Sequence, residues 1–158
     1  MSYLLLNVFL ALAWISLTAQ FTPLNFLEGF VVAYGVLWLT HRAFGGSPAY
    51  FLQVPRVLGF LAYFVKELIV ANLRVAHDVL TPRHHMRPAI VAVPLDAASD
   101  LEITLLANIL TLTPGTLSLD VSDDRRVLFV HCMYVRDVEQ AKRDIKEGFE
   151  RRLLEILR

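Results

Sequence analysis

The chain has 158 residues, of which 56% are hydrophobic and 19% are charged, so it is too apolar for an ordinary soluble domain of this length. This composition indicates a membrane protein. Lysine plus arginine equals aspartate plus glutamate at 15 each, so no basic excess points to nucleic acid and no acidic excess points to a solvating tail.

Residues 1–40 predict a transmembrane helical hairpin. The apolar run from Tyr3 to Leu17 predicts an uncleaved first helix rather than a signal peptide, because no basic segment precedes it and a second apolar run follows at once. Pro23 suits the first turn of a second helix that extends from Leu24 to about Thr40. The short link between the two runs predicts that the helices are antiparallel and that both span the bilayer.

Glu28 is the one ionisable group of this hairpin. It follows Pro23 closely, so we expect it near the membrane interface and near the positive end of the helix dipole, where a carboxylate is tolerated. We favour an interfacial anchor or a partner contact, and a proton relay is the alternative. Gly29 and Ala33 are four residues apart and would permit close approach of the two helices.

Residues 41–87 form the least apolar part of the membrane half. The stretch from His41 to Pro55 predicts a loop near the interface, and residues 56–80 predict an amphipathic helix. Its longest uncharged run, from Val57 to Val65, is too short to cross the hydrocarbon core. The charged and polar side chains share one arc of the helix; they are Arg56, Tyr63, Lys66, Glu67, Arg74, His77 and Asp78.

Two placements of this helix remain open. It lies in the interface with its charged arc toward water or headgroups, or it crosses as a third span with Lys66, Glu67 and Arg74 turned toward partner helices. Basic residues before the helix and after it belong on the same side by the positive-inside rule, which favours two spans with both ends cytoplasmic. His84 and His85 in the connector are a weak metal signal, and a basic connector that faces headgroups is favoured instead.

Residues 88–158 predict a small cytoplasmic domain of order βαββα. Ala89 to Leu95 predicts the first strand, and the capping-box pair Ser99 and Glu102 predicts a helix that begins at about Asp100. That helix is apolar nearly all round, so we expect it to be buried on more than one side. Its thin polar stripe consists of Thr104, Asn108 and Thr111.

The rest of this domain predicts a hairpin and a final helix. Leu117, Leu119 and Val121 alternate with polar residues, which predicts a strand with one buried face. The more continuous apolar run 126–133 predicts the centre of the sheet, with Cys132 as a small buried hydrophobe. The last helix, 137–157, presents a charged face with the pairs Glu139–Arg143 and Glu147–Arg151. A right-handed crossover between the first two strands would place both helices on one face of the sheet.

One motif joins the helix to the second strand through a Pro-Gly turn. Asn108, Thr111 and Thr113 are small hydrogen-bonding residues that suit a helix end, and Gly115 suits a positive φ. The run resembles the Leu-Ala-Asn-x-x-Thr-Leu-Thr-Pro-Gly-Thr signature of the E subunit of the Mrp (Mnh) multisubunit cation/proton antiporters, and the likeness extends over nearly the whole chain. The matching residues, here called the signature, are Leu106, Ala107, Asn108, Thr111, Leu112, Thr113, Pro114, Gly115 and Thr116.

This resemblance implies an accessory subunit of a sodium or lithium/proton antiporter in the bacterial cytoplasmic membrane. The implied partners are large subunits related to those of respiratory complex I, together with small membrane subunits and the lipid bilayer. The implied role is assembly and stabilisation of the complex, with the signature as a packing and partner-contact element and with no cofactor. The near absence of ionisable groups from the hairpin agrees with this role, because a proton path needs them.

Two other functions are weighed against it. The chain contributes directly to the ion path if Lys66, Glu67 and Arg74 cross the membrane, with Glu28 facing the same path. It is a membrane-anchored enzyme if His131 and Asp120 act as an acid/base pair. We predict that it is not an enzyme, because no phosphate-cradling loop, nucleophile elbow, metalloprotease helix or dinucleotide fingerprint occurs.

Overall fold

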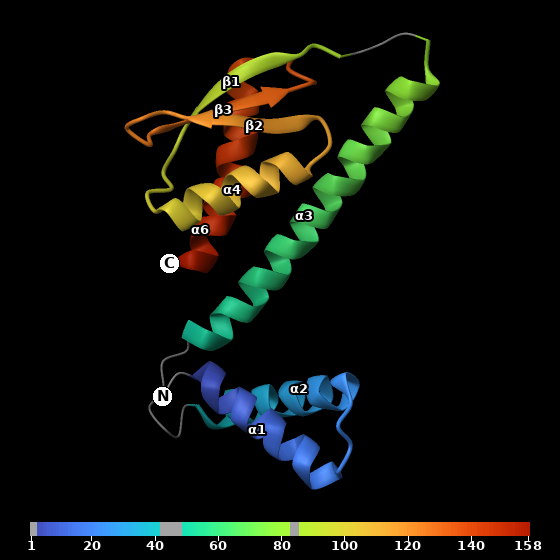
Figure 1. Cartoon of the computed structure of the whole chain (residues 1–158), viewed down its shortest axis with the longest axis vertical. Coiled ribbons are helices and arrows are strands. Elements are labelled where there is room, and N and C mark those ends of the chain that lie inside the picture. Colours follow the sequence, from blue (N-terminus) through green and yellow to red (C-terminus); the bar gives the residue numbers. More distant parts are fainter. Residues whose placement is uncertain (1–2, 42–48, 83–85) are drawn as a thin grey trace. The chain divides into compact units, whose positions relative to one another are not determined.

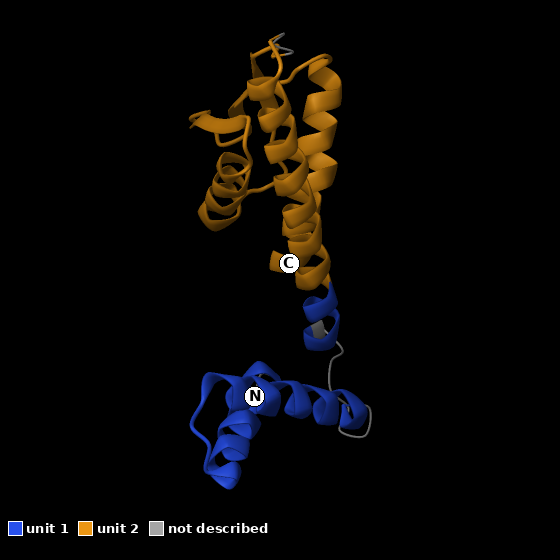
Figure 2. Cartoon of the chain, turned by 90° about the vertical axis from the view of Figure 1, so that its right-hand side faces the viewer, with its two compact units in different colours: residues 1–55 blue, residues 56–158 orange. Residues whose placement is uncertain are grey.

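The computed structural model describes residues 3–41, 49–82 and 86–158. The chain divides into two compact units, residues 1–55 and 56–158 (Figure 2). His84, His85 and most of the predicted loop after His41 lie outside the described residues, so the metal and loop predictions for them stay predictions.

The first unit contains the predicted helical hairpin, α1 (Tyr3–Thr18) and α2 (Pro23–Thr40) (Figure 1). A Cβ atom on Gly29 would lie 2.8 Å from Trp14, so the glycine permits the close approach that the sequence predicts. The Trp14 Nε1–H donates to Asn25 Oδ1 at 3.0 Å, and the Asn25 amide donates to the carbonyl of Gln20 at 2.7 Å. These bonds hold the link between the helices. The buried residues of α1 and α2 are Asn7, Ala11, Asn25, Gly29, Ala33 and Leu37.

The third helix, α3 (Ala49–Leu80), begins earlier than predicted. The expected loop up to Pro55 is wrong for its last part, because Pro55 lies inside the helix. Proline has no N–H to donate to the carbonyl four residues earlier, which is that of Phe51. The Tyr34 hydroxyl donates to this carbonyl at 3.3 Å, and this bond from α2 replaces the missing one. Tyr34 is far from Pro55 in the sequence, so the residues around Pro55 gave no sign of this hydrogen bond.

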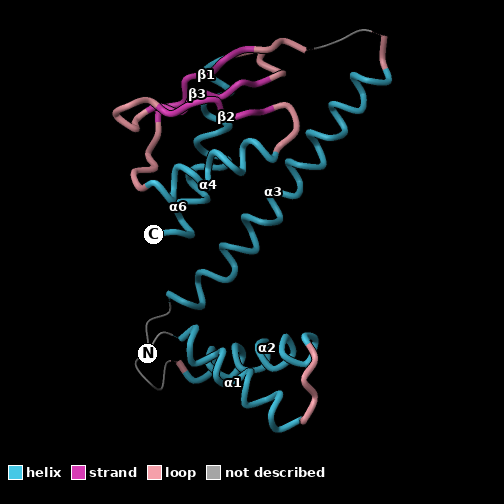
Figure 3. The backbone as a smooth tube through the Cα atoms, in the orientation of Figure 1, coloured by secondary structure: helices cyan, strands magenta, loops and turns pink. Residues whose placement is uncertain are grey.

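The second unit contains a three-stranded sheet of β1 (Ala89–Pro94), β2 (Thr116–Val121) and β3 (Val127–Cys132) (Figure 3). The strand order is β1-β3-β2, and both outer strands pair antiparallel with β3. The predicted central position of the apolar third strand is therefore confirmed. Cys132 is buried as expected, and burial raises the pKa of its thiol.

Helices cover one face of this sheet. They are α4 (Asp100–Leu112), which carries the predicted capping box, and a C-terminal helical stretch of α5 (Val138–Arg143), η1 (Asp144–Glu150) and α6 (Arg151–Leu157). Figure 1 shows α4 and α6 on the same side of the sheet. The buried core between them consists of Val91, Val93, Leu106, Leu110, Leu128, Val130, Cys132, Val135, Ile145, Phe149 and Leu153.

The middle of the C-terminal stretch, η1, is a π-helix, which the helical spacing of the apolar residues did not predict. The ion pairs also differ from the predicted ones. Arg151 pairs with Glu155 at 3.8 Å rather than with Glu147, and within α5 Glu139 pairs with Lys142 at 2.7 Å rather than with Arg143. The wider turn starts where Ile145 and Phe149 enter the core.

The predicted orientation of β2 is wrong for Leu117 and Leu119, whereas Val121 packs against the core as predicted. The Ser118 hydroxyl donates to the Ala107 carbonyl of α4 at 3.0 Å, so serine faces the helices, whereas Leu117 and Leu119 are 46% and 48% exposed. The register of β2 against β3 shifts between Ser118 and Asp120, which a period-two pattern cannot anticipate. No described segment of the second unit covers the second face of the sheet. We call it the open sheet face; its apolar residues are Ile90, Leu117, Leu119 and the half-buried Phe129, and His131 lies between Ile90 and Leu117.

Candidate interaction surfaces and polar groove

The polar arc of α3 faces the chain's own C-terminal domain. Tyr63 and Phe64 pack against the domain core, and Ala71 and Asp78 are buried further along the same side. The domain buries Asp78 and partly covers Tyr63 and Glu67. The other charged side chains of the arc stay exposed, so its placement toward water or headgroups stays a prediction; they are Arg56, Lys66, Arg74 and His77. The outer side of α3 is apolar and exposed. It is formed by Leu58, Leu61, Val65, Ile69 and Leu73.

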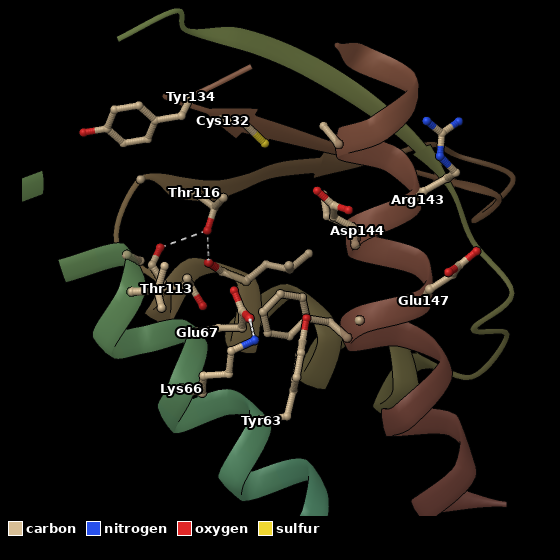
Figure 4. A pocket seen from close by; sticks show the side chains of 18 of the residues that line it. Tyr63, Lys66, Glu67, Thr113, Thr116, Cys132, Tyr134, Arg143, Asp144 and Glu147 are labelled. Carbon is tan, nitrogen blue, oxygen red and sulfur yellow. Dashed lines mark hydrogen bonds and ion pairs between the residues drawn. The ribbon is translucent and has the colours of Figure 1, made fainter. Parts of the chain in front are cut away.

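A groove of about 670 Å³ lies between α3, the signature turn and the C-terminal helical stretch (Figure 4). Figure 4 shows Lys66, Glu67, Thr116 and Asp144 pointing into it, whereas Arg143 points away. The Lys66 ammonium lies 3.2 Å from the Glu67 carboxylate. The structure thus brings the candidate polar residues of α3 together with the second half of the signature, a juxtaposition that the sequence did not predict.

The signature turn is held by its threonines. The Thr113 hydroxyl donates to the Ile109 carbonyl at 3.1 Å, and the Thr116 hydroxyl donates to the Thr113 carbonyl at 2.9 Å. Thr111 accepts a bond from the Ser118 amide at 3.2 Å. Gly115 has a φ of 90°, which confirms the predicted left-handed turn position. The prediction that small polar residues satisfy the helix end is confirmed for Thr111 and Thr113.

The remaining signature residues divide between core and surface. Leu106 is fully buried, Ala107 and Pro114 are half-buried, and Asn108 and Leu112 are exposed on α4. The polar stripe of α4, Thr104, Asn108 and Thr111, therefore faces outward rather than into a second layer of this chain. This exposed surface is available to another protein.

Tyr63 joins α3 to the C-terminal stretch. Its ring lies edge-on to Phe149, with 5.3 Å between the ring centres, and the Arg152 guanidinium lies 4.5 Å from the centre of the Tyr63 ring. The Tyr63 hydroxyl contacts the backbone of η1 at Gly148, where a side chain would not fit. Sequence reasoning placed Tyr63 in the polar arc but missed this contact, because nothing local marks Gly148 as its partner.

The far end of the groove is formed around Tyr134. The Arg74 guanidinium lies 5.4 Å from the centre of its ring. Burial and the neighbouring Asp78 carboxylate raise the pKa of Tyr134, so the phenol stays neutral at physiological pH. Arg74 thus contacts the aromatic lining of the groove.

Two buried carboxylates anchor the loop before α4. Glu150 accepts bonds from the amides of Asp96 and Ala97 at 2.6 and 2.9 Å. Glu102 accepts a bond from the Arg158 guanidinium at 2.9 Å, and this bond, with two backbone amides, lowers its pKa to about 2. The sequence identified the capping role of Glu102 but gave no sign of its bond to the last residue of the chain.

Residues 7–156 match the sequence model of a family that is described as "Na+/H+ ion antiporter subunit". The chain belongs to this family, that of the Na+/H+ antiporter E subunits. It is 39% identical to the Na+/H+ antiporter E subunit of Alkalihalophilus pseudofirmus over 153 residues, which cover 97% of this chain and 96% of the relative.

Two solved structures are also similar. One is a chain of the membrane-bound sulfane sulfur reductase, an archaeal respiratory membrane complex, with 32% identity, a TM-score of 0.57 and 96% coverage of both chains. The other belongs to the Mrp complex of Dietzia sp. DQ12-45-1b, with 29% identity, a TM-score of 0.50, and coverage of 65% of this chain and 96% of that one. Both are subunits of membrane complexes, and an antiporter E subunit likewise works as part of such an assembly.

The other candidate residues of this antiporter E subunit do not converge on one site. Glu28 is exposed on α2, in the first unit. His131 lies opposite Leu117 and Asp120 lies opposite Phe129, so the imagined acid/base pair is not a cross-strand pair. Within the described residues, no three His, Cys, Asp or Glu side chains gather as a metal site requires.

Proposed function

We propose that this chain is an accessory subunit that assembles and stabilises a monovalent cation/proton antiporter, and that it is neither the ion translocator nor an enzyme. The observation that carries this proposal is the nature of the polar groups inside the hairpin. The buried ones, Asn7 and Asn25, are neutral amides, and the single acid, Glu28, points outward. A proton path needs groups that exchange protons, and an amide does not.

The hairpin and α3 have different relations to the membrane in this proposal. Among the described helices, α2 is long and apolar enough to cross by itself, and α1, with 16 residues, is slightly short. We place both helices in the bilayer, because the link between them is short. If α2 spans the membrane, α1 must lie in the membrane beside it. Pairing also lets α1 satisfy a buried amide of α2 away from water, since the Trp14 Nε1–H donates to Asn25 Oδ1.

We place α3 on the membrane surface rather than across it. Residues Phe60, Tyr63, Phe64, Ala71 and Asp78 pack along the second unit, so a crossing α3 would take that unit into the hydrocarbon core. The unit carries charged residues on α5 and α6 that the hydrocarbon would not solvate. The exposed apolar side of α3 suits the interface, and the basic residues around it favour the cytoplasmic side.

Two exposed surfaces of the second unit suit contact with other subunits. Ile90 is 64% exposed on the open sheet face, in line with Leu117 across β3. Asn108 and Leu112 of the signature are exposed on α4. Apolar patches of this kind on a small domain mark interaction sites, and other subunits of the antiporter are the proposed partners.

Co-purification tests this proposal. The chain is tagged after Arg158, extracted from its native membrane in mild detergent, and its bound proteins are identified. We expect large polytopic antiporter subunits, whose recovery decreases with Leu117→Ser or Asn108→Ala and is unchanged with the matched surface variant Arg126→Ala. Recovery of the chain alone, stable and monodisperse, would reject the proposal.

A further inference from the structure

The groove and the apolar outer side of α3 meet along one edge of the helix. Lys66 and Val70 line both the groove and a shallow apolar surface formed by Leu58, Leu61, Ala62, Val65 and Ile69. The Lys66 side chain is 67% exposed there. The polar groove and the apolar surface of α3 therefore meet at the Lys66 side chain.

Cations gather at this edge around one aromatic ring. The Lys66 ammonium lies 5.8 Å and the Arg152 guanidinium 4.5 Å from the centre of the Tyr63 ring, on α3 and α6 respectively. The Arg152 Nε–H is buried and has no hydrogen-bond partner among the described residues. A buried donor without a partner is costly, so an acceptor supplied from outside the chain would stabilise it.

The outer side of α3 is an exposed apolar surface, which is unfavourable in contact with water. Leu61 and Ile69 are 53% and 54% exposed, and no described segment of the second unit packs on them. The same helix begins at Ala49, directly after the hairpin that we place in the bilayer, so lipid is the closest apolar material. This step rests on the surface position proposed above.

We propose that this edge binds one anionic phospholipid. Its phosphate group lies between Lys66 and Arg152, and its acyl chains lie along Leu61, Val65 and Ile69 toward the bilayer. The arrangement matches basic pockets that bind acidic headgroups at the membrane surface. An amphiphile satisfies both halves of the site, whereas a free phosphate leaves the apolar half exposed. Either phosphate has to replace the Glu67 carboxylate as the partner of Lys66, so the apolar half favours the lipid.

Native mass spectrometry of the purified full chain in detergent tests this proposal. The probes are dioleoyl phosphatidylglycerol, dioleoyl phosphatidylcholine and glycerol phosphate. We expect one phosphatidylglycerol to remain bound, the zwitterionic lipid to bind more weakly, and glycerol phosphate not to displace it. Lys66→Ala should weaken phosphatidylglycerol binding about fivefold, as expected for one basic residue at a membrane surface.

Control variants distinguish the contribution of the Lys66 charge from that of the apolar contacts and from a loss of folding. Arg126→Ala removes an exposed cation from the turn between β2 and β3 and should leave lipid binding unchanged. Leu61→Ser with Ile69→Ser should weaken retention of phosphatidylglycerol while Lys66 stays in place. Equal binding of both lipids, displacement by glycerol phosphate, or unchanged binding to Lys66→Ala would each overturn the proposal. The isolated chain is used, so the result is independent of whether other subunits co-purify.

Discussion

Gly148 and Tyr63 lie in direct contact, and the Tyr63 hydroxyl occupies the space that any side chain at position 148 would need. This contact brings α3 against the π-helical turn of the C-terminal stretch. It also closes one wall of the groove, because both residues line it. A Cβ atom at position 148 would therefore force the Tyr63 side chain to shift.

Gly148→Ala should destabilise the second unit by ~1–3 kcal/mol, the usual cost of overpacking a close contact. The tyrosine would have to move, and its stacking with Phe149 and Arg152 would be lost with it. Chemical denaturation of the purified chain measures the change. The double variant Tyr63→Phe with Gly148→Ala should recover part of the loss, because it removes the clashing oxygen.

Gly59→Ala is the matched control for that experiment. Gly59 lies in α3, and a Cβ atom there would meet no atom within 4 Å. It should stabilise the helix by up to ~1 kcal/mol, since alanine favours a helix over glycine. If Gly148→Ala and Gly59→Ala destabilised the chain equally, the loss would come from replacing a helical glycine and not from the contact with Tyr63.

Gly115→Ala should destabilise the signature turn by ~1–2 kcal/mol, the cost of a left-handed backbone for a residue with a Cβ atom. The new methyl group would also approach the Tyr134 ring at 3.3 Å. Thermal unfolding of the full chain measures the change. Pro114→Ala, which leaves the φ of Gly115 free, should have the smaller effect; the reverse order would contradict the role given to Gly115.

Stability should fall in acid because of Glu102. Its pKa is about 2 in the folded chain, against an ordinary value of 4.5, so its stabilisation is complete above pH 4.5 and is lost as the pH falls toward 2. Glu102→Gln should be less stable at neutral pH and should lack this part of the acid dependence. Unfolding curves between pH 2 and 6 measure it, with Glu139→Gln as a surface control that keeps the dependence. An unchanged acid profile in Glu102→Gln would refute the assignment.

Gly29→Ala should loosen the hairpin by ~1–3 kcal/mol, because the new methyl group would overlap Trp14. Gly35→Ala, on the same helix, meets no atom within 4 Å and should be neutral. Denaturation in detergent compares the two, followed by the fluorescence of Trp14 in chains whose other tryptophan is replaced by Trp38→Phe. Equal stability of Gly29→Ala and Gly35→Ala would contradict the role of Gly29 in the contact between α1 and α2.

The elements with strong local signals were predictable from sequence. Ser99 and Glu102 marked the start of α4, Pro23 marked the start of α2, and the continuous apolarity of β3 marked its central place. Each depends on residues within one or two turns of each other. The signature also identified the family correctly, because nine matching residues within eleven positions carry more information than a short spaced motif.

The failures depend on contacts between distant residues. Pro55 stands inside a helix because Tyr34 supplies the missing donor, and Ser118 faces the core because β2 shifts register against β3. The chain widens into a π-helix at Asp144, which the regular apolar spacing of the last helix does not indicate. The groove brings α3 next to the signature turn and, at Gly148, next to η1, and no local pattern marks this glycine.

The most direct test of the accessory role is cation/proton exchange by the complete antiporter complex that carries Glu28→Gln, Lys66→Ala and Glu67→Ala together. The three side chains are exposed or half-buried and hold no buried hydrogen bond, so the altered chain should still assemble. Exchange in everted membrane vesicles is normalised to the amount of intact complex. We predict exchange close to that of the unaltered complex; abolished exchange in a fully assembled complex would show that this chain takes part in ion movement.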